Sequence, residues 1–412
     1  MHIAIIGGGA SGMMAAITAA GAGASVTLLE SGSVLGKKIL STGNGRCNLT
    51  NLSLDPSLYQ GSFRRHAAVL LREFGVADTL AFFESIGIPT VEAASARGND
   101  AWVYPACKEA AALRMALALE CERLGVEILY DTRVSGLSKQ EGSFRILCEN
   151  GSKITADRVI LSTGGKAFPK SGSDGSGYAL AQGFGHGLVT PLPALGALIS
   201  SHPGCKNLSG IRVDGELSLL VEEEITARER GEIQFTDYGL SGIPVFQLSG
   251  RAVRELVAEH RVMLSLDLKP EQSKEELFLD LVERKIRREG KESGTLLLGL
   301  VPSKMVPVLF KLCGIPLHVP CEEISKDNLL KLAEQLKKLG FEIVDARDFD
   351  ACQVTSGGIP ATEVSLALES IKVKGLYFAG EILDLDGPCG GYNLQWAWSS
   401  GHAAGLAAAK EE

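Results

Sequence analysis

The sequence predicts an α/β fold in which a largely parallel sheet is interrupted by inserted domains. Three features lead to this prediction. The apolar run Ile3–Ile6 leads directly into a glycine-rich turn and a helix-forming stretch, as expected for a strand buried on both faces. Strand-like and helix-like segments then alternate to about residue 190. A second strand–loop–helix unit spans residues 376–409.

The first turn, GGGASG at residues 7–12, fits the pattern G-x-G-x-x-G. Gly7 allows the tight turn from strand to helix, and Gly9 leaves room for a pyrophosphate to approach the backbone. Gly12 lets the helix pack close to the sheet. The phosphates then meet free N–H groups at the positive end of the helix dipole. The turn therefore predicts a site for the adenosine diphosphate half of a dinucleotide.

A second predicted strand, Ser25–Leu29, is followed by Glu30, whose carboxylate can accept hydrogen bonds from ribose hydroxyls. The same carboxylate would repel a 2′-phosphate, so an NADP-type adenosine does not suit this site. The motif and its acid leave open whether the ligand is FAD or NAD.

Length and composition indicate a globular protein of two or three domains. The chain has 412 residues, 45% of them hydrophobic, and a net charge of −8. This charge gives no general attraction to nucleic acid, although a local basic patch is left open. The longest apolar stretches are broken by Pro or Lys, so no transmembrane helix is expected. Because the first strand leaves no room for a signal peptide, we expect a cytoplasmic protein.

The cysteines and histidines do not indicate a metal centre. Nine cysteines are scattered without a C-x-x-C pair, and their odd count argues against a disulfide framework or a zinc site. Seven histidines are equally dispersed. Most of the cysteines are expected to be buried thiols, and no metal is predicted.

Composition also shifts along the chain, near Pro191 and again near residue 350. Between these points, Glu222–Gly231 is predicted to be a charged turn or hairpin region and Gly239–Pro244 a tight loop. The prediction has three parts: a discontinuous dinucleotide-binding domain (1–190 and 351–412), a β-rich inserted domain (191–268 and 341–350) and a helical subdomain (269–340).

The C-terminal segment repeats the order of elements at the N terminus, which is a buried strand, a glycine-rich loop and a helix. A buried strand at Leu376–Ala379 is followed by Glu381, a glycine-rich loop and an apolar helix that begins at Tyr392. The first N–H groups of that helix have no helical acceptor. Together the two ends indicate a flavin enzyme, because the first unit suits the AMP half of FAD and Glu381 the ribityl or pyrophosphate region. The last helix would stabilise the negative charge of a reduced flavin.

No second G-x-G-x-x-G follows a strand, so a dedicated site for NADH or NADPH is not predicted. Cys47 has no nearby cysteine partner, which excludes a disulfide reductase of the two-cysteine kind. Either nicotinamide cofactor could still reduce the flavin by binding transiently in the substrate cleft.

Five blocks of the sequence resemble the HI0933-like flavoprotein family, which includes NAD(FAD)-utilising dehydrogenases, aminoacetone oxidase-like enzymes and a bile-acid reductase group. The resemblance covers essentially the whole chain. It implies a Rossmann-like FAD-binding domain interrupted by a β-rich domain and a small helical domain. The blocks are GKKILSTGNGRCNLTN (36–51), ILSTGGKAFPKSGSDGSGYALAQGFGH (160–186), GEIQFTDYGLSG (231–242), VTSGGI (354–359) and GLYFAGEILDLDGPCGGYNLQWAWSSGHAAG (375–405).

The resemblance also implies which residues hold FAD, from its phosphates to its ring. One block departs from the family pattern, since the usual phenylalanine–proline stretch is Tyr104–Lys108 here, and this would alter the wall of the substrate pocket. The implied residues are Gly7, Gly9, Ala10, Ser11 and Gly12 at the pyrophosphate, Glu30 at the ribose, Lys37 or Lys38 beside the adenosine or phosphates, Gly43, Asn44, Gly45, Arg46, Cys47 and Asn48 along the ribityl chain, Val134 at adenine, Thr163, Gly164 and Gly165 over the cofactor, and Gly380, Glu381, Gly391, Tyr392, Asn393 and Leu394 at the ribityl and pyrimidine end.

Two residues are candidate catalytic acids. Arg46 would favour a thiolate at Cys47, which could protonate a substrate carbon after hydride transfer, or Cys47 could only pack against the flavin. Tyr392 is the second candidate, with pocket lining as its alternative.

Several functions fit these features. The first is an FAD-dependent reductase that saturates a polarised C=C bond of a small apolar substrate, such as a 3-oxo-4-ene steroid or bile acid. An amine oxidase acting on an aminoacetone-like substrate with O2, an rRNA dihydrouridine synthase-like reductase and a non-catalytic flavin-binding sensor are the alternatives. The expected partner is a small molecule, and the oligomeric state is left open.

Overall fold

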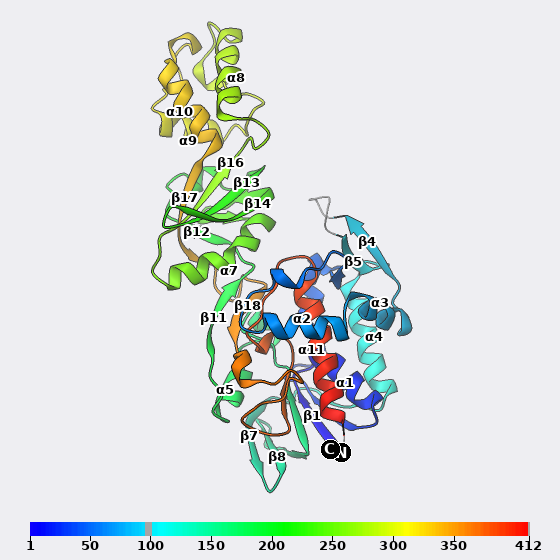
Figure 1. Ribbon diagram of the computed structural model, residues 1–412. Coiled ribbons are helices and arrows are strands. Elements are labelled where there is room, and N and C mark those ends of the chain that lie inside the picture. The colour runs from blue at the N-terminus through cyan, green and yellow to red at the C-terminus, as the bar shows by residue number, and fades with distance from the viewer. Residues whose placement is uncertain (95–100, 411–412) are drawn as a thin grey trace. The chain divides into compact units, whose positions relative to one another are not determined.

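A computed structural model describes residues 1–94 and 101–410 of the chain. The chain divides into two compact units. The first unit contains Met1–Ala194 and Asp348–Glu412, and the second contains Leu195–Arg347 (Figure 1). The first unit is therefore built from both ends of the sequence.

A five-stranded parallel sheet forms the centre of the first unit. Its strands are mostly buried except at one edge, β6, and Ile3 and Ile5 at the centre are completely covered. In the register, Ile3 lies opposite Arg158 on one side and Val26 on the other. The predicted parallel sheet is thus confirmed. Its order is β19 (Leu376–Phe378), β10 (Arg158–Leu161), β1 (His2–Ile6), β2 (Ser25–Leu29) and β6 (Glu127–Leu129).

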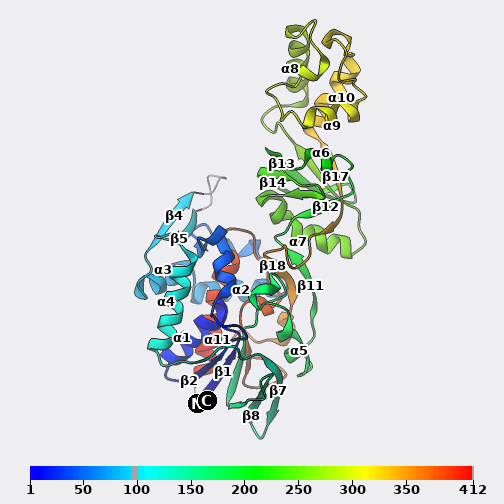
Figure 2. The same ribbon diagram turned by 180° about the vertical axis from the view of Figure 1, so that it is seen from behind.

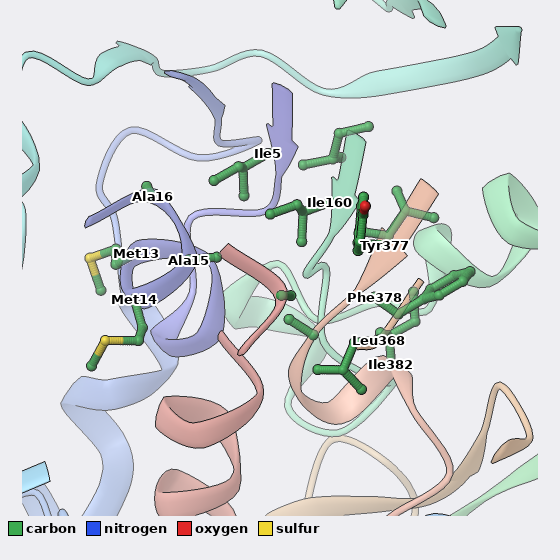
Figure 3. Packing of buried hydrophobic residues seen from close by; sticks show 14 of the residues in the cluster. Ile5, Met13, Met14, Ala15, Ala16, Ile160, Leu368, Tyr377, Phe378 and Ile382 are labelled. Atoms are coloured by element: carbon green, nitrogen blue, oxygen red, sulfur yellow. The ribbon is translucent and has the colours of Figure 1, made fainter. Parts of the chain in front are cut away.

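The first and last helices of the chain, α1 (Ala10–Gly21) and α11 (Tyr392–Ala409), pack side by side in this unit (Figure 1). Met13 and Met14 of α1 are fully buried with the apolar side chains of the sheet (Figure 3). The two helices approach closely because α11 carries glycines at the contact. A Cβ on Gly401 would lie 2.4 Å from the Ser11 carbonyl oxygen.

Smaller elements surround this core. One of them is an antiparallel three-stranded sheet of β7 (Val134–Gln140), β8 (Ser143–Cys148) and β9 (Lys153–Ala156). The described part of this unit also contains short helices and a small mixed-length sheet. They are α2 (Arg64–Glu73), α3 (Val76–Ser85), α4 (Ala110–Arg123), α5 (Ser176–Gln182) and a sheet of β3 (Thr50–Asn51), β5 (Ala101–Pro105) and β4 (Thr90–Ala94).

Two strands lie where the chain leaves and re-enters the first unit. β11 (Val189–Ala194) pairs antiparallel with β18 (Val354–Gly358), with Ala194 opposite Val354. A register shift interrupts this pair between Val189 and Leu192.

A closed six-stranded barrel occupies the second unit (Figure 2). The barrel order is β12 (Leu198–Ser200), β15 (Gly239–Ser241), β14 (Glu224–Phe235), β13 (Arg212–Val221), β16 (Val262–Asp267) and β17 (Leu339–Ala346). The chain reverses at Glu222 and Glu223, which both have positive φ, and a strand resumes at Glu224. Of the two alternatives for Glu222–Gly231, a turn or a hairpin region, the structure shows the hairpin, in which β13 and β14 pair antiparallel across this two-residue turn. The charges of the region alternate along β14 and face outward.

The expected tight loop at Gly239–Pro244 is wrong, since its first half is β15 and a helix begins at Ile243. Serine N-caps start two of the helices in this unit, at Ser273 and Ser325. No helix among the described residues is long and apolar enough to cross a membrane. The helices are α6 (Cys205–Leu208), α7 (Ile243–Val257), α8 (Lys274–Arg287), α9 (Met305–Cys313) and α10 (Lys326–Lys337).

A buried histidine joins the segment after α5 to the loop before β19. His186 Nδ1 lies 3.0 Å from a carboxylate oxygen of Glu363, and its Nε2 lies 2.8 Å from the Ser370 hydroxyl. Lys372 Nζ pairs with the other oxygen of Glu363 at 2.7 Å. Burial lowers the pKa of His186, although the neighbouring Glu363 acts in the opposite direction. The imidazole is therefore neutral in the folded protein at neutral pH.

We expect Gly405→Leu to destabilise the first unit, because a Cβ there would lie 2.5 Å from the Ala15 carbonyl oxygen. Overpacking of this kind costs about 1–3 kcal/mol, measured as the free energy of unfolding in urea. Leu406→Ala, at an exposed position of the same helix, is the matched control and should change stability by less than about 0.5 kcal/mol. Equal losses in both variants would contradict the close helix contact.

Protonation of His186 should destabilise the fold. Its pKa is lowered by folding, so between the folded and unfolded values, below about pH 6.5, the unfolded chain binds the proton that the native state lacks. The free energy of unfolding therefore decreases as the pH falls through this window. In His186→Gln, the slope of unfolding free energy against pH should be shallower there than in wild type. His318→Gln, at an exposed site, should keep the wild-type slope, and a wild-type slope in His186→Gln would refute the assignment.

Candidate cofactor and active site

The N terminus of α1 has the geometry expected of a phosphate-binding turn. Gly9 is its N-cap, and no described side chain caps the helix. A Cβ on Gly12 would lie 1.9 Å from the Gly7 carbonyl oxygen, whereas a Cβ on Gly9 would have no atom within 4 Å. Gly7 has φ of 105°, which L side chains rarely adopt. Gly7 and Gly12 therefore serve the turn itself, and Gly9 leaves open space beside free N–H groups.

Glu30 lies next to this turn at the carboxyl end of β2. Its carboxylate accepts hydrogen bonds from the backbone N–H groups of Gly8, at 2.9 Å, and Gly32, at 2.7 Å. Its carbonyl accepts from the N–H of Thr132 at 2.8 Å, so the start of β7 at Val134 is near. These bonds hold the carboxylate where it can accept further bonds from ribose hydroxyls.

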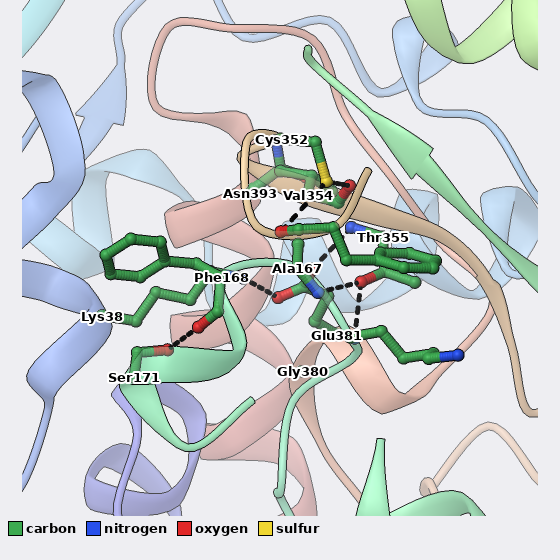
Figure 4. Close-up of polar contacts among 12 residues, drawn as sticks. Lys38, Ala167, Phe168, Ser171, Cys352, Val354, Thr355, Gly380, Glu381 and Asn393 are labelled. Carbon is green, nitrogen blue, oxygen red and sulfur yellow. Dashed lines mark hydrogen bonds and ion pairs between the residues drawn. The ribbon is translucent and has the colours of Figure 1, made fainter. Parts of the chain in front are cut away.

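Lys38 and Glu381 form an ion pair at 2.7 Å across 343 positions of the chain (Figure 4). The second oxygen of Glu381 accepts from the N–H of Thr355 at 2.7 Å. The Thr355 hydroxyl in turn accepts from the N–H groups of Lys166 and Ala167, at 2.8 and 2.9 Å. The charge of Lys38 is thus compensated, whereas its neighbour Lys37 is exposed.

The segment 163–165 follows β10 and crosses the first turn. Ser162 donates from its hydroxyl to the carbonyls of Ile6 and Gly7, at 3.1 and 2.9 Å. A Cβ on Gly165 would lie 2.3 Å from the Thr355 hydroxyl, so only glycine allows this approach. The segment therefore joins the first turn to the loop that carries Thr355.

The loop Gly43–Asn48 lies near the N terminus of α11. It leads into β3, where Asn51 Nδ2 donates to the Gly390 carbonyl at 3.0 Å and the Thr50 hydroxyl donates to Gln395 Oε1 at 2.6 Å. Asn44 has φ of 56°, an uncommon conformation for a residue other than glycine. The backbone is therefore held in a strained turn beside the last helix.

The N terminus of α11 is presented without a side-chain cap. Its N-cap Gly391 has φ of 91°, and a Cβ there would lie 2.5 Å from the Thr50 backbone. The Asn393 side chain clasps Gly387, accepting from its N–H and donating to its carbonyl, both at 2.8 Å. The glycine-rich loop is thereby fixed directly before a helix start that has no side-chain cap.

The expected thiolate at Cys47 is wrong. The side chain is completely buried by protein atoms, and burial raises the pKa of the thiol to about 12 despite a hydrogen bond with Thr42. Arg46 does not offset this rise in the pKa of the thiol, because its guanidinium lies over the Tyr104 ring, 5.5 Å from the ring centroid. Cys47 is therefore a neutral packing residue in this arrangement.

Tyr392, the other candidate acid, is only 4% exposed. Its hydroxyl accepts from the backbone N–H of Asp55 at 3.1 Å, and its carbonyl accepts from the Tyr59 hydroxyl at 2.7 Å. The two rings meet edge to face at 5.4 Å. These contacts give Tyr392 a role in holding the start of α11.

The sequence missed Thr355 and the stacking of Arg46 on Tyr104. Thr355 lies in the quoted block VTSGGI, but only the fold shows that its hydroxyl joins two loops. The contact between Arg46 and Tyr104 joins segments far apart in sequence, so no local sequence pattern predicts it.

FAD fits this arrangement. The open space at Gly9, the uncapped start of α1 and the carboxylate of Glu30 suit its adenosine diphosphate half. The second uncapped helix suits a ring that becomes negatively charged on reduction.

Comparisons with curated proteins give relatives along the full chain. A 3-dehydro-bile acid Δ(4,6)-reductase of Clostridium scindens is 40% identical over 413 residues, covering 99% of both chains. A ribosomal RNA dihydrouridine synthase of Escherichia coli is 30% identical and covers 97% of this chain and 96% of its own.

Two solved structures share the fold at low sequence identity. A 3-ketosteroid-Δ4-(5α)-dehydrogenase of Rhodococcus jostii RHA1 matches with a TM-score of 0.51 and 19% identity, covering 99% of this chain and 96% of its own. A 3-ketosteroid Δ1-dehydrogenase of Sterolibacterium denitrificans matches with a TM-score of 0.52 and 12% identity, covering 99% of each chain.

These findings confirm the predicted class, and the chain is an FAD-dependent oxidoreductase. The description "HI0933-like protein Rossmann domain" applies to residues 1–407. With nearly every residue inside that match and a 40% identical relative aligned from end to end, the chain belongs to the HI0933-like family.

Proposed function

We propose that the protein is an FAD-dependent reductase that saturates a C=C bond conjugated to a carbonyl in a 3-oxo-4-ene steroid or bile-acid-like substrate. The observation that carries this proposal is the 40% identity, over 99% of both chains, with a 3-dehydro-bile acid Δ(4,6)-reductase. NADH or NADPH is the proposed electron donor. The chain has no second dinucleotide motif, so the donor would bind transiently in the substrate cleft.

Different residues of the site would hold different parts of FAD. When bound, FAD supplies two-electron hydride chemistry. Gly9, Ser11 and the start of α1 would hold its pyrophosphate, and Glu30 its ribose. The N–H groups at the start of α11 favour negative charge, which stabilises the reduced form of the cofactor.

An rRNA dihydrouridine synthase is the second candidate, supported by relatives in Escherichia coli and Haemophilus influenzae at 30% and 28% identity. The chemistry is related, because dihydrouridine is uridine whose C5=C6 bond, conjugated to a carbonyl, has been reduced. The net charge of −8 favours a small apolar substrate over RNA. A cytoplasmic location and a small-molecule partner stay predictions.

The proposal can be tested with the purified, FAD-loaded protein under anaerobic conditions. We expect NADH or NADPH to bleach the visible flavin absorbance, and a 3-oxo-4-ene bile acid to restore it with formation of the saturated product. Restoration by an unmodified rRNA fragment alone would favour the second candidate. Bleaching by aminoacetone but by neither nicotinamide would support the oxidase alternative, and no bleaching by any donor would overturn the reductase.

Gly9→Val should abolish tight FAD binding without unfolding the protein. A Cβ at Gly9 meets no atom within 4 Å, so the side chain would occupy only the space assigned to the pyrophosphate. We expect FAD affinity to fall at least about tenfold in a fluorescence titration, a loss of about 1.4 kcal/mol. Gly21→Val, at the far end of α1 with equally open surroundings, is the matched control. Wild-type affinity in Gly9→Val would refute this placement of the cofactor.

A further inference from the structure

Arg46 is an exposed arginine whose guanidinium is nevertheless held in place. Its Nε donates to the Gly43 carbonyl at 3.3 Å, and the guanidinium lies 5.5 Å from the centroid of the Tyr104 ring. The bond to Gly43 uses only Nε, so the two terminal nitrogens keep their N–H donors. A planar guanidinium that lies over an aromatic ring can still donate hydrogen bonds from these nitrogens to an oxygen atom.

Among the described residues, no acidic side chain pairs with the charge of Arg46. No carboxylate of residues 1–94 and 101–410 forms an ion pair with it, whereas Lys38 nearby is paired with Glu381. The two side chains next to it are neutral, because burial raises the pKa of both Tyr104 and Cys47. Within the described part of the chain, this positive charge therefore has no carboxylate partner.

The position of this charge connects it with the proposed reaction. The same loop continues into β3, which is bonded to Gly390 and to Gln395 at the start of α11. The guanidinium and the uncapped helix start therefore contribute positive potential to one region of the first unit. Asn44 and Cys47, both with positive φ, keep the loop in an uncommon conformation around Arg46.

We propose that Arg46 is a catalytic residue that binds the carbonyl oxygen of the enone substrate and stabilises the negative charge that develops on it. This inference rests on the proposed function. FAD, reduced by a nicotinamide donor, would supply the hydride that the β-carbon of the enone gains. The C=C electron pair shifts to form an enolate, with its charge on oxygen, and a proton from solvent then adds to the α-carbon. Arg46 donates hydrogen bonds to that oxygen and exchanges no proton.

Kinetics of Arg46→Gln test the role. Loss of a donor that acts on a developing oxyanion lowers kcat by about 100-fold. We expect kcat and kcat/KM to fall together, because the bound enone is neutral and the charge first develops in the transition state. Arg46→Lys keeps the charge but not the planar fork, and should recover part of the rate. Arg72→Gln, at an exposed arginine of α2, is the control and should keep wild-type values. Flavin absorbance and thermal melting of each variant report whether the fold and cofactor are intact.

A second measurement does not depend on turnover. Estradiol, whose phenolic A ring resembles the enolate, is titrated into the FAD-loaded protein, and the ultraviolet absorbance of its phenolate is followed against pH. We expect wild type to ionise the bound phenol at least about tenfold more than free phenol at the same pH, and Arg46→Gln to lose this gain.

Three results are decisive. Loss of both the rate and the phenolate signal in Arg46→Gln supports the assignment. A wild-type rate and phenolate signal in Arg46→Gln overturn it and leave the reductase standing. If wild type neither reduces the enone nor binds the phenol, the proposed function and the role of Arg46 both fail.

Discussion

The contact between α1 and α11 is the constraint on which the site depends. Gly401 and Gly405 bring the two helices together at a distance that larger side chains would not allow. α11 also fixes the turn after β19, since Ser400 accepts from the N–H of Gly380 at 2.9 Å and Trp396 donates to its carbonyl at 3.1 Å. Two uncapped helix starts from opposite ends of the sequence are thereby held in one unit.

The parts of the fold that could be predicted are those that local sequence determines. An apolar run, a glycine turn and a helix-forming stretch are neighbours in sequence, so β1, the turn and α1 follow from a short segment. Glu30 could be placed because it ends the next strand. The outward charges of β14 left a turn and a hairpin equally open, because alternation with few apolar residues is also typical of an exposed turn.

The parts of the site that could not be predicted depend on contacts between distant segments. The pairing of Lys38 with Glu381 and the stacking of Arg46 on Tyr104 have no local signature. For Cys47 the neighbouring arginine suggested a thiolate, but ionisation depends on solvent more than on sequence neighbours. A thiol without exposed surface keeps its proton even beside a cation when the cation points elsewhere.

The discontinuity of the first unit has a consequence for the order in which the protein is completed. The ribosome delivers β1, β2 and α1 first, but β19 and α11 follow only after the whole of Leu195–Arg347. Until then, the α11-facing side of α1 is uncovered and β10 is an unpaired edge of the nascent sheet. The inserted unit has its own closed barrel and can form during this interval. A folded insertion keeps Ala194 and Asp348 at a fixed separation, so the late segment returns without the entropy cost of closing a long flexible loop.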